Sequence, residues 1–147
     1  MIKSIEHVGI AVKSLEERIP FYRDTLGLAF HGIEELPERH LRIAVFDCGG
    51  VRLELLQSTS PETTIASFIE KRGEGLHHLA LSVGDVRESL AAVVAAGVEP
   101  IDSEPRPGAG GTMIAFLNPN STGRVLIELV EKLNQSISIR RDPLSTV

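Results

Sequence analysis

Apolar and polar residues alternate over residues 2–12, and this pattern predicts a β-strand. Residues 77–84 have a similar pattern, and when the two segments are aligned, His78 falls on His7. Small or apolar residues follow the histidine in both segments. The match predicts an internal repeat in which each copy opens with a strand that carries a histidine.

A helix is predicted after each of these strands. Ser14 and Asp85 each have a glutamate three residues later, which is a signal for the start of a helix. Pro20 interrupts the first helix and removes one of its hydrogen bonds, so we expect a kink or a short first turn there. The residues expected to face inward are Leu15, Ile19, Tyr22 and Leu26 in the first helix, and Leu90, Val93 and Val94 in the second, at about residues 86–96.

Three further strands are predicted in each copy. They cover about residues 28–34, 41–48 and 51–57 in the first copy, and about residues 98–103, 111–117 and 124–131 in the second. A short helix near residues 65–69 joins the copies, and the Pro- and Gly-rich segment 105–111 is predicted to be a loop.

The chain is therefore predicted to be an α+β protein built from paired βαβββ modules. We expect one domain over residues 1–132, made of a module at about 1–60 and a module at about 75–132. Residues 133–147 have no clear period and are expected to be an exposed or disordered tail.

Composition narrows the function classes. The formal net charge of −5 argues against nucleic acid and anionic membranes as partners, and no apolar run is long enough for a membrane helix. The single cysteine, Cys48, cannot form an internal disulfide, and the first residues do not read as a signal peptide. These features predict a cytoplasmic protein.

Two glutamates stand inside apolar strand segments at matching places in the repeat, Glu54 in the first copy and Glu128 in the second. A buried carboxylate is costly unless it is paired, hydrogen-bonded or bound to a cation. Either glutamate, considered alone, could instead face solvent from a half-exposed strand. Either histidine, considered alone, could be an ordinary core or surface residue.

The repeat changes this interpretation because it places the two histidines at matching positions and the two glutamates at matching positions. Two imidazoles and two carboxylates, brought together by a pseudo-twofold axis, suit a divalent cation such as Co²⁺, Mn²⁺, Ni²⁺ or Zn²⁺. Of the adjacent histidines, His78 is the expected ligand because it aligns with His7, whereas His77 is expected to be a structural neighbour.

The chain resembles the vicinal-oxygen-chelate superfamily and, within it, the methylmalonyl-CoA epimerase family. The resemblance covers residues 4–131. The stretches that carry it are His7-Val8-Gly9-Ile10-Ala11-Val12, Phe21-Tyr22-Arg23-Asp24-Thr25-Leu26-Gly27-Leu28, Gly75-Leu76-His77-His78-Leu79-Ala80, the Gly-rich loop at 108–111 and Val125-Leu126-Ile127-Glu128-Leu129.

The resemblance implies a curled, eight-stranded mixed sheet around a metal cleft, an acyl-CoA substrate and a homodimer. It carries the metal ligands onto His7, Glu54, His78 and Glu128, and it makes Co²⁺ the first expected ion. The implied reaction interconverts (2R)- and (2S)-methylmalonyl-CoA by removal and return of the α-proton through an enolate. Where a bacterial member has a glutamate proposed as the base, this chain has Ile43.

Glu128 is the first expected acid–base residue, and Glu54 is its counterpart for the second face. Glu38 is a more remote candidate. Three cations, Lys71, Arg72 and Arg106, either bind the CoA phosphates or are solvated surface charges.

Three other functions fit the same superfamily. Glyoxalase I (lactoylglutathione lyase) shares the two-histidine, two-glutamate site. An extradiol dioxygenase uses two histidines and one glutamate around iron, which Glu54 argues against, as does Tyr22 being the sole tyrosine. A non-catalytic small-molecule-binding member would be expected to lack the ligands and to be rich in aromatic residues, but aromatic residues make up only 4% of this chain.

Overall fold

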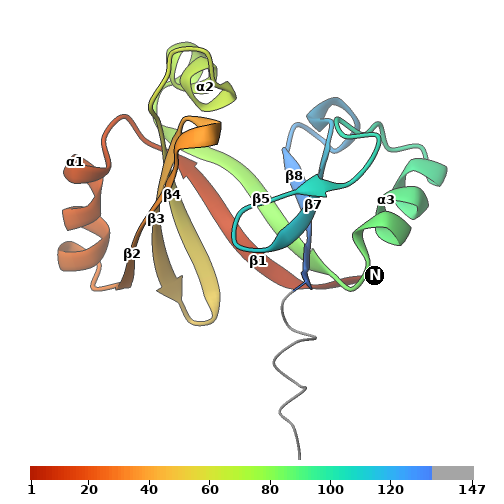
Figure 1. Cartoon of the computed structure of the whole chain (residues 1–147), viewed down its shortest axis with the longest axis horizontal. Coiled ribbons are helices and arrows are strands. Elements are labelled where there is room, and N and C mark those ends of the chain that lie inside the picture. The colour runs from red at the N-terminus through yellow and green to blue at the C-terminus, as the bar shows by residue number, and fades with distance from the viewer. Residues whose placement is uncertain (134–147) are drawn as a thin grey trace, which may run out of the picture. The chain divides into compact units, whose positions relative to one another are not determined.

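The computed structural model describes residues 1–133, and the elements of this part of the chain are drawn in Figure 1. The strands are β1 (Ile2–Ala11), β2 (Ala29–Leu36), β3 (Leu41–Cys48), β4 (Val51–Ser58), β5 (Gly75–Val83), β6 (Arg106–Pro107), β7 (Thr112–Leu117) and β8 (Ile127–Lys132). The α-helices are α1 (Leu15–Pro20), α2 (Thr64–Arg72) and α3 (Val86–Ala95). The first module follows its predicted order, and the joint helix is longer than expected.

The eight strands belong to one mixed sheet, and the α+β class is confirmed. The described part of the chain forms two compact units, one of Ile5–Ala80 and one of Met1–Ser4 with residues 81–133. In the first unit the strand order is β2-β3-β4-β1-β5, with β1 and β4 parallel. In the second unit the order is β5-β8-β7-β6, and the β6–β7 and β7–β8 pairs are antiparallel. The predicted module boundaries at residues 60 and 75 stay a prediction.

The first helix changes its geometry at Pro20, where a kink or a short first turn was expected. Ser14 caps α1 by accepting a hydrogen bond from the Glu17 N–H at 3.3 Å. Proline cannot donate to the preceding turn, and the chain continues as a π-helix over Phe21–Thr25. The prediction that Leu26 faces inward is wrong, because the longer π-turn rotates the register and leaves Leu26 52% exposed.

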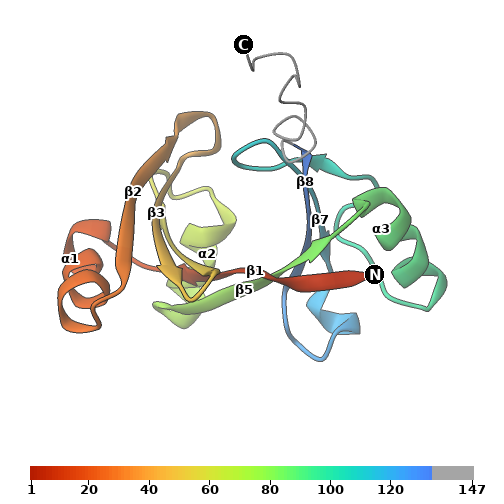
Figure 2. The same cartoon turned by 90° about the horizontal axis from the view of Figure 1, so that it is seen from below.

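The two faces of β3 and β4 are covered by different helices (Figure 2). On one face, Leu15 and Ile19 of α1 pack with Ala44, Phe46, Leu55 and Val12. On the other face, Ile65 of α2 packs with Ala11, Ile43 and Leu56. These side chains alternate between the faces along each strand, as the pleat requires. The face that carries α2 is also the face of Glu54, because Glu54 and Leu56 are two residues apart.

In the second unit, α3 packs against β7 and β8 (Figure 1). Asp85 caps this helix by accepting a hydrogen bond from the Glu88 N–H at 2.9 Å. Val86, Leu90 and Val93 pack on the sheet, but the prediction that Val94 faces inward is wrong, since it is 42% exposed. One residue advances the helix by about 100°, which places Val94 roughly a quarter turn from the centre of the buried stripe.

The predicted strand at residues 98–103 is wrong. This segment forms no regular strand: it has an isolated bridge between Pro100 and Leu117, and the N–H groups of Ile101 and Asp102 both donate to the Phe116 carbonyl. The Asp102 carboxylate accepts a hydrogen bond from the Phe116 N–H at 2.8 Å, and this bond replaces a backbone ladder contact. The two-residue strand β6 lies instead inside the predicted loop, and the last strand begins at Ile127 rather than near residue 124.

The predicted tail covers residues 133–147, of which residues 134–147 lie outside the described part of the chain. Within residues 1–133, no helix has the length and apolar character needed to cross a membrane.

Candidate metal and proton-transfer site

The four residues expected to bind a metal lie on four different strands. His7 on β1, Glu54 on β4 and His78 on β5 belong to the unit Ile5–Ala80, and Glu128 on β8 belongs to the other unit. His7, Glu54 and Glu128 are only 7%, 5% and 6% exposed. The alternative that the two glutamates face solvent is therefore wrong, and each buried carboxylate needs a compensating partner.

The two predicted histidine ligands meet inside the first unit. Nε2 of His7 lies 2.9 Å from Nε2 of His78, and the rings are edge to face with centroids 5.0 Å apart. Between two neutral imidazoles only one of these nitrogens can donate a proton, and the other accepts it. Two ring nitrogens that converge in this way can also direct their lone pairs at one cation.

Gly9 makes the space for this histidine pair. A Cβ built on Gly9 would overlap Cε1, Nδ1 and Nε2 of the His78 ring. Gly9 is also the register partner of Glu54 in the parallel β1–β4 pair, so its neighbour across the strands is the predicted carboxylate ligand. Glycine is required here by the close approach of the ring rather than by an unusual backbone angle.

Glu6 is a buried carboxylate that the sequence analysis missed. Its carboxylate is hydrogen-bonded to Nδ1 of His7, while Oε2 of Glu54 lies 3.4 Å from the same nitrogen. A carboxylate that accepts the Nδ1 proton fixes the tautomer of an imidazole and leaves Nε2 as the ligand atom. Its position directly before His7 was the signal in the sequence.

Arg52 is the second residue that the sequence analysis missed. Its Nη2 donates a hydrogen bond to Oε2 of Glu54, and its Nη1 lies 3.7 Å from Oε1 of Glu6. Its Nε is buried without a hydrogen-bond partner in the described structure. Burial on its own would lower the pKa of Arg52, but the hydrogen bond to Glu54 and the charges of Glu54, Glu6 and Glu34 raise it overall. The two-residue spacing from Glu54 was the signal, since residues i and i+2 share a strand face.

His77 supports His78 from the other side. Its Nδ1 lies 2.9 Å from Nδ1 of His78, and its ring meets Phe68 edge to face at 5.1 Å. The guanidinium of Arg72 lies over the Phe68 ring, with Cζ 5.6 Å from the ring centroid. The expectation that His77 is a structural neighbour is consistent with these contacts.

The remaining candidates lie elsewhere. Nε of Arg106 donates a hydrogen bond to Oδ1 of Asp102 at 3.0 Å, and its guanidinium lies over the Phe116 ring. Glu38 is exposed in a 3₁₀ turn. Ile43 is buried in the apolar cluster beside Leu56 and carries no proton to transfer.

Within the unit Ile5–Ala80, Glu6, His7 and Glu54 offer ligand atoms that lie within 4.8 Å of one another. Imidazole and carboxylate donors of this kind fit a divalent cation. The donor set also contains the acids and bases that proton transfer requires.

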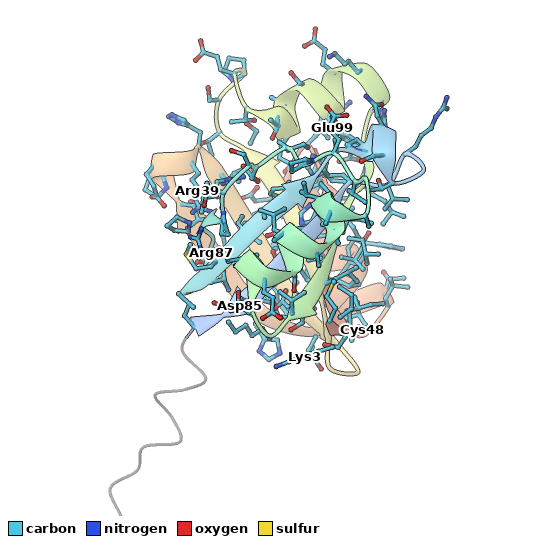
Figure 3. All side chains as sticks on the ribbon, turned by 90° about the vertical axis from the view of Figure 1, so that its right-hand side faces the viewer. Lys3, Arg39, Cys48, Asp85, Arg87 and Glu99 are labelled. Carbon is cyan, nitrogen blue, oxygen red and sulfur yellow. The ribbon has the colours of Figure 1, made fainter. Side chains whose placement is uncertain are left out.

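A cavity of about 460 Å³ occurs in the other unit, at the start of α3. Lys3 and Asp85, which Figure 3 labels, are among its lining residues. None of the four predicted ligands lines it.

The sequence and the fold have well-defined relatives. The model of the Glyoxalase/Bleomycin resistance protein/Dioxygenase superfamily matches residues 6–116. The uncharacterized protein YqjC of Bacillus subtilis is 41% identical over 86% of this chain and 91% of its own length. The ethylmalonyl-CoA/methylmalonyl-CoA epimerase of Cereibacter sphaeroides is 32% identical over 88% of this chain and 98% of its own length.

Among solved structures, a variant of the methylmalonyl-CoA epimerase of Streptomyces coelicolor, in complex with 2-nitronate-propionyl-CoA, superposes with a TM-score of 0.83. It is 33% identical and the match covers 90% of this chain and 99% of that one. These matches confirm the family expected from the histidine-led strands and the last strand. The chain therefore belongs to the glyoxalase/bleomycin resistance protein/dioxygenase superfamily and, within it, to the family of methylmalonyl-CoA epimerase enzymes.

Proposed function

We propose that the protein interconverts (2R)- and (2S)-methylmalonyl-CoA. The observation that carries this proposal is the partly buried His7–His78 pair, with the buried Glu6 and Glu54 beside it, in a chain that matches epimerases over nearly its whole length. The relatives named for epimerase activity, one of them in complex with a CoA ester, support an acyl-CoA substrate.

The metal ligands in this proposal are His7, Glu54, His78 and Glu128. The Nε2 atoms of His7 and His78 lie 2.9 Å apart and would both be available to one cation. Glu128 enters the set because the repeat matches it to Glu54. Co²⁺ is the first candidate ion, with Mn²⁺, Ni²⁺ and Zn²⁺ as alternatives. When bound, the cation supplies positive charge that stabilises the enolate oxygen.

Proton transfer is assigned to the two glutamates. Glu128 takes the α-proton as a carboxylate base, the C–H bonding pair moves toward the thioester carbonyl, and the enolate forms. A proton delivered to the opposite face of the same carbon gives the other epimer. Glu54 is the candidate donor there from its carboxylic-acid form, which leaves Glu54 as a carboxylate while Glu128 keeps the α-proton. No electron is gained or lost over the cycle, so no redox partner is required.

The proposed setting of this reaction is a homodimer in the cytoplasm. The dimer and the cytoplasmic location are both expectations from the sequence. Size-exclusion chromatography with light scattering measures the assembly state directly.

Exchange of the α-proton tests the proposal. Co²⁺-loaded protein is mixed with methylmalonyl-CoA in D₂O, and proton NMR follows the α-proton signal. Rapid loss of the signal with wild-type protein, and slow loss with Glu128→Gln, supports both the reaction and the role of Glu128. Rapid loss with both proteins keeps the reaction and removes Glu128 as the base. Absence of exchange with metal-loaded wild-type protein would show that methylmalonyl-CoA is not the substrate. The hemithioacetal of methylglyoxal and glutathione is then the substrate to test next.

A further inference from the structure

Two buried carboxylates, Glu6 and Glu54, face one guanidinium. Their side chains are 3% and 6% exposed, and Arg52 reaches both of them from β4. Such closely placed carboxylates would repel each other without a positive partner, because water screens them poorly when they are buried. Arg52 supplies a charge that is permanent, since a guanidinium stays protonated in proteins.

Arg52 and His7 compete for the same oxygen of Glu54. Oε2 of Glu54 accepts the hydrogen bond from Nη2 of Arg52 and lies 3.4 Å from Nδ1 of His7. The strand register explains this arrangement, because His7 pairs with Arg52 and Gly9 pairs with Glu54 in the parallel β1–β4 ladder. A two-residue step along β4 therefore places the guanidinium directly beside the carboxylate.

We propose that Arg52 is a positioning residue that holds Glu54 within the site and competes with a divalent cation for its carboxylate. This inference rests on the proposed function, because it takes Glu54 as a metal ligand. Arg52 then has two effects with opposite consequences. It stabilises the metal-free protein by pairing its positive charge with Glu54 and Glu6, and it weakens metal binding through competition and like-charge repulsion.

Calorimetric titration of metal-free protein with Co²⁺ tests this role without substrate. Arg52→Gln should bind Co²⁺ about tenfold more tightly than wild type, and the metal-free variant should unfold at a lower temperature. Arg52→Lys keeps the charge but lacks the forked guanidinium, so its Kd should fall by about threefold. The ligand-field absorption of bound Co²⁺ should shift in both variants, because Glu54 is no longer shared with a guanidinium.

Arg42→Gln is the matched control. Arg42 also pairs with two carboxylates in the same unit, Glu16 at 2.8 Å and Glu35 at 3.0 Å, but it lies on the opposite strand face from Ile43 and Glu54. Its substitution should lower stability and leave the Co²⁺ affinity unchanged.

Unchanged or weaker Co²⁺ affinity in both Arg52 variants overturns the proposal, and Arg52→Lys decides the matter alone if Arg52→Gln does not fold. If wild-type protein exchanges the α-proton and the Arg52 variants have the Co²⁺ affinity of wild type, the proposed function stands and only the role of Arg52 is wrong. If wild-type protein binds no Co²⁺, both the proposed metal site and the proposed role of Arg52 are wrong.

Discussion

The imidazole of His78 fills the space where a side chain on residue 9 would begin. Three atoms of that ring lie where the first carbon of any larger residue would stand at Gly9. The glycine on β1 thus determines how closely the ring of β5 approaches, and the same glycine pairs directly with Glu54 of β4. The position of the second histidine is set by the absence of a side chain on a neighbouring strand.

Gly9→Ala should therefore displace His78. We expect the substitution to weaken Co²⁺ binding by at least about tenfold, and to lower the free energy of unfolding by about 1–3 kcal/mol because the strand or the ring must shift. Calorimetric titration and urea unfolding measure the two effects. Gly75→Ala is the matched control, since Gly75 is in the same unit and a Cβ there meets nothing within 4 Å. Equal Co²⁺ affinity in wild type and Gly9→Ala would contradict the assigned role of the glycine.

Glu6→Gln should weaken metal binding without removing a proposed ligand. The Glu6 carboxylate accepts the Nδ1 proton of His7, and loss of such a partner typically costs 10- to 100-fold in metal affinity. The readout is the Co²⁺ dissociation constant from calorimetric titration. Glu70→Gln, on the exposed side of α2, should leave that constant unchanged. If both variants bind Co²⁺ as wild type does, Glu6 does not orient His7.

Leu15→Ala and Leu26→Ala should differ strongly, although both residues belong to the predicted apolar stripe. Leu15 is fully buried against Phe46 and Leu55, so its truncation should cost about 2–5 kcal/mol of unfolding free energy. Leu26 is exposed after the π-helix, so its truncation should change that free energy by no more than about 0.5 kcal/mol. Urea unfolding of the two variants checks the difference. Equal losses would mean that the helix keeps its regular register past Pro20.

Glu74 should give the protein an acid-dependent part of its stability. The hydrogen bond from Arg18, followed by the one from the Lys13 backbone N–H, lowers the pKa of Glu74 below its ordinary value of 4.5. A lowered folded-state pKa means that this stabilisation is complete above about pH 4.5 and is lost as the pH falls through the folded-state value. Urea unfolding should show that Glu74→Gln is less stable than wild type at neutral pH and that the difference disappears in acid. A difference that persists unchanged in acid would rule out the ionised carboxylate as its source.

Several elements could be predicted because their signals are local. Ser14 and Asp85 cap the helices that follow them, and Pro20 ends regular α-helix, since each effect depends on hydrogen bonds within one turn. The strand predicted at residues 98–103 was wrong because Asp102 satisfies the Phe116 N–H with its side chain, a contact that no local pattern shows. The exposure of Leu26 was missed because the π-helix after Pro20 shifts the helical register, and the exposure of Val94 was missed because helical periodicity does not specify which residues a neighbouring sheet covers.

The sequence by itself determined the superfamily through its resemblance to known members. It also determined the α+β class and the four ligand candidates, because a repeat preserves residue types at matching positions. Only the tertiary structure decided which groups surround them. Glu6 and Arg52 belong to the site because the parallel register of β1 and β4 places them beside His7 and Glu54. Register depends on hydrogen bonds between strands that are distant in sequence, and the charge balance around a buried carboxylate depends on that register.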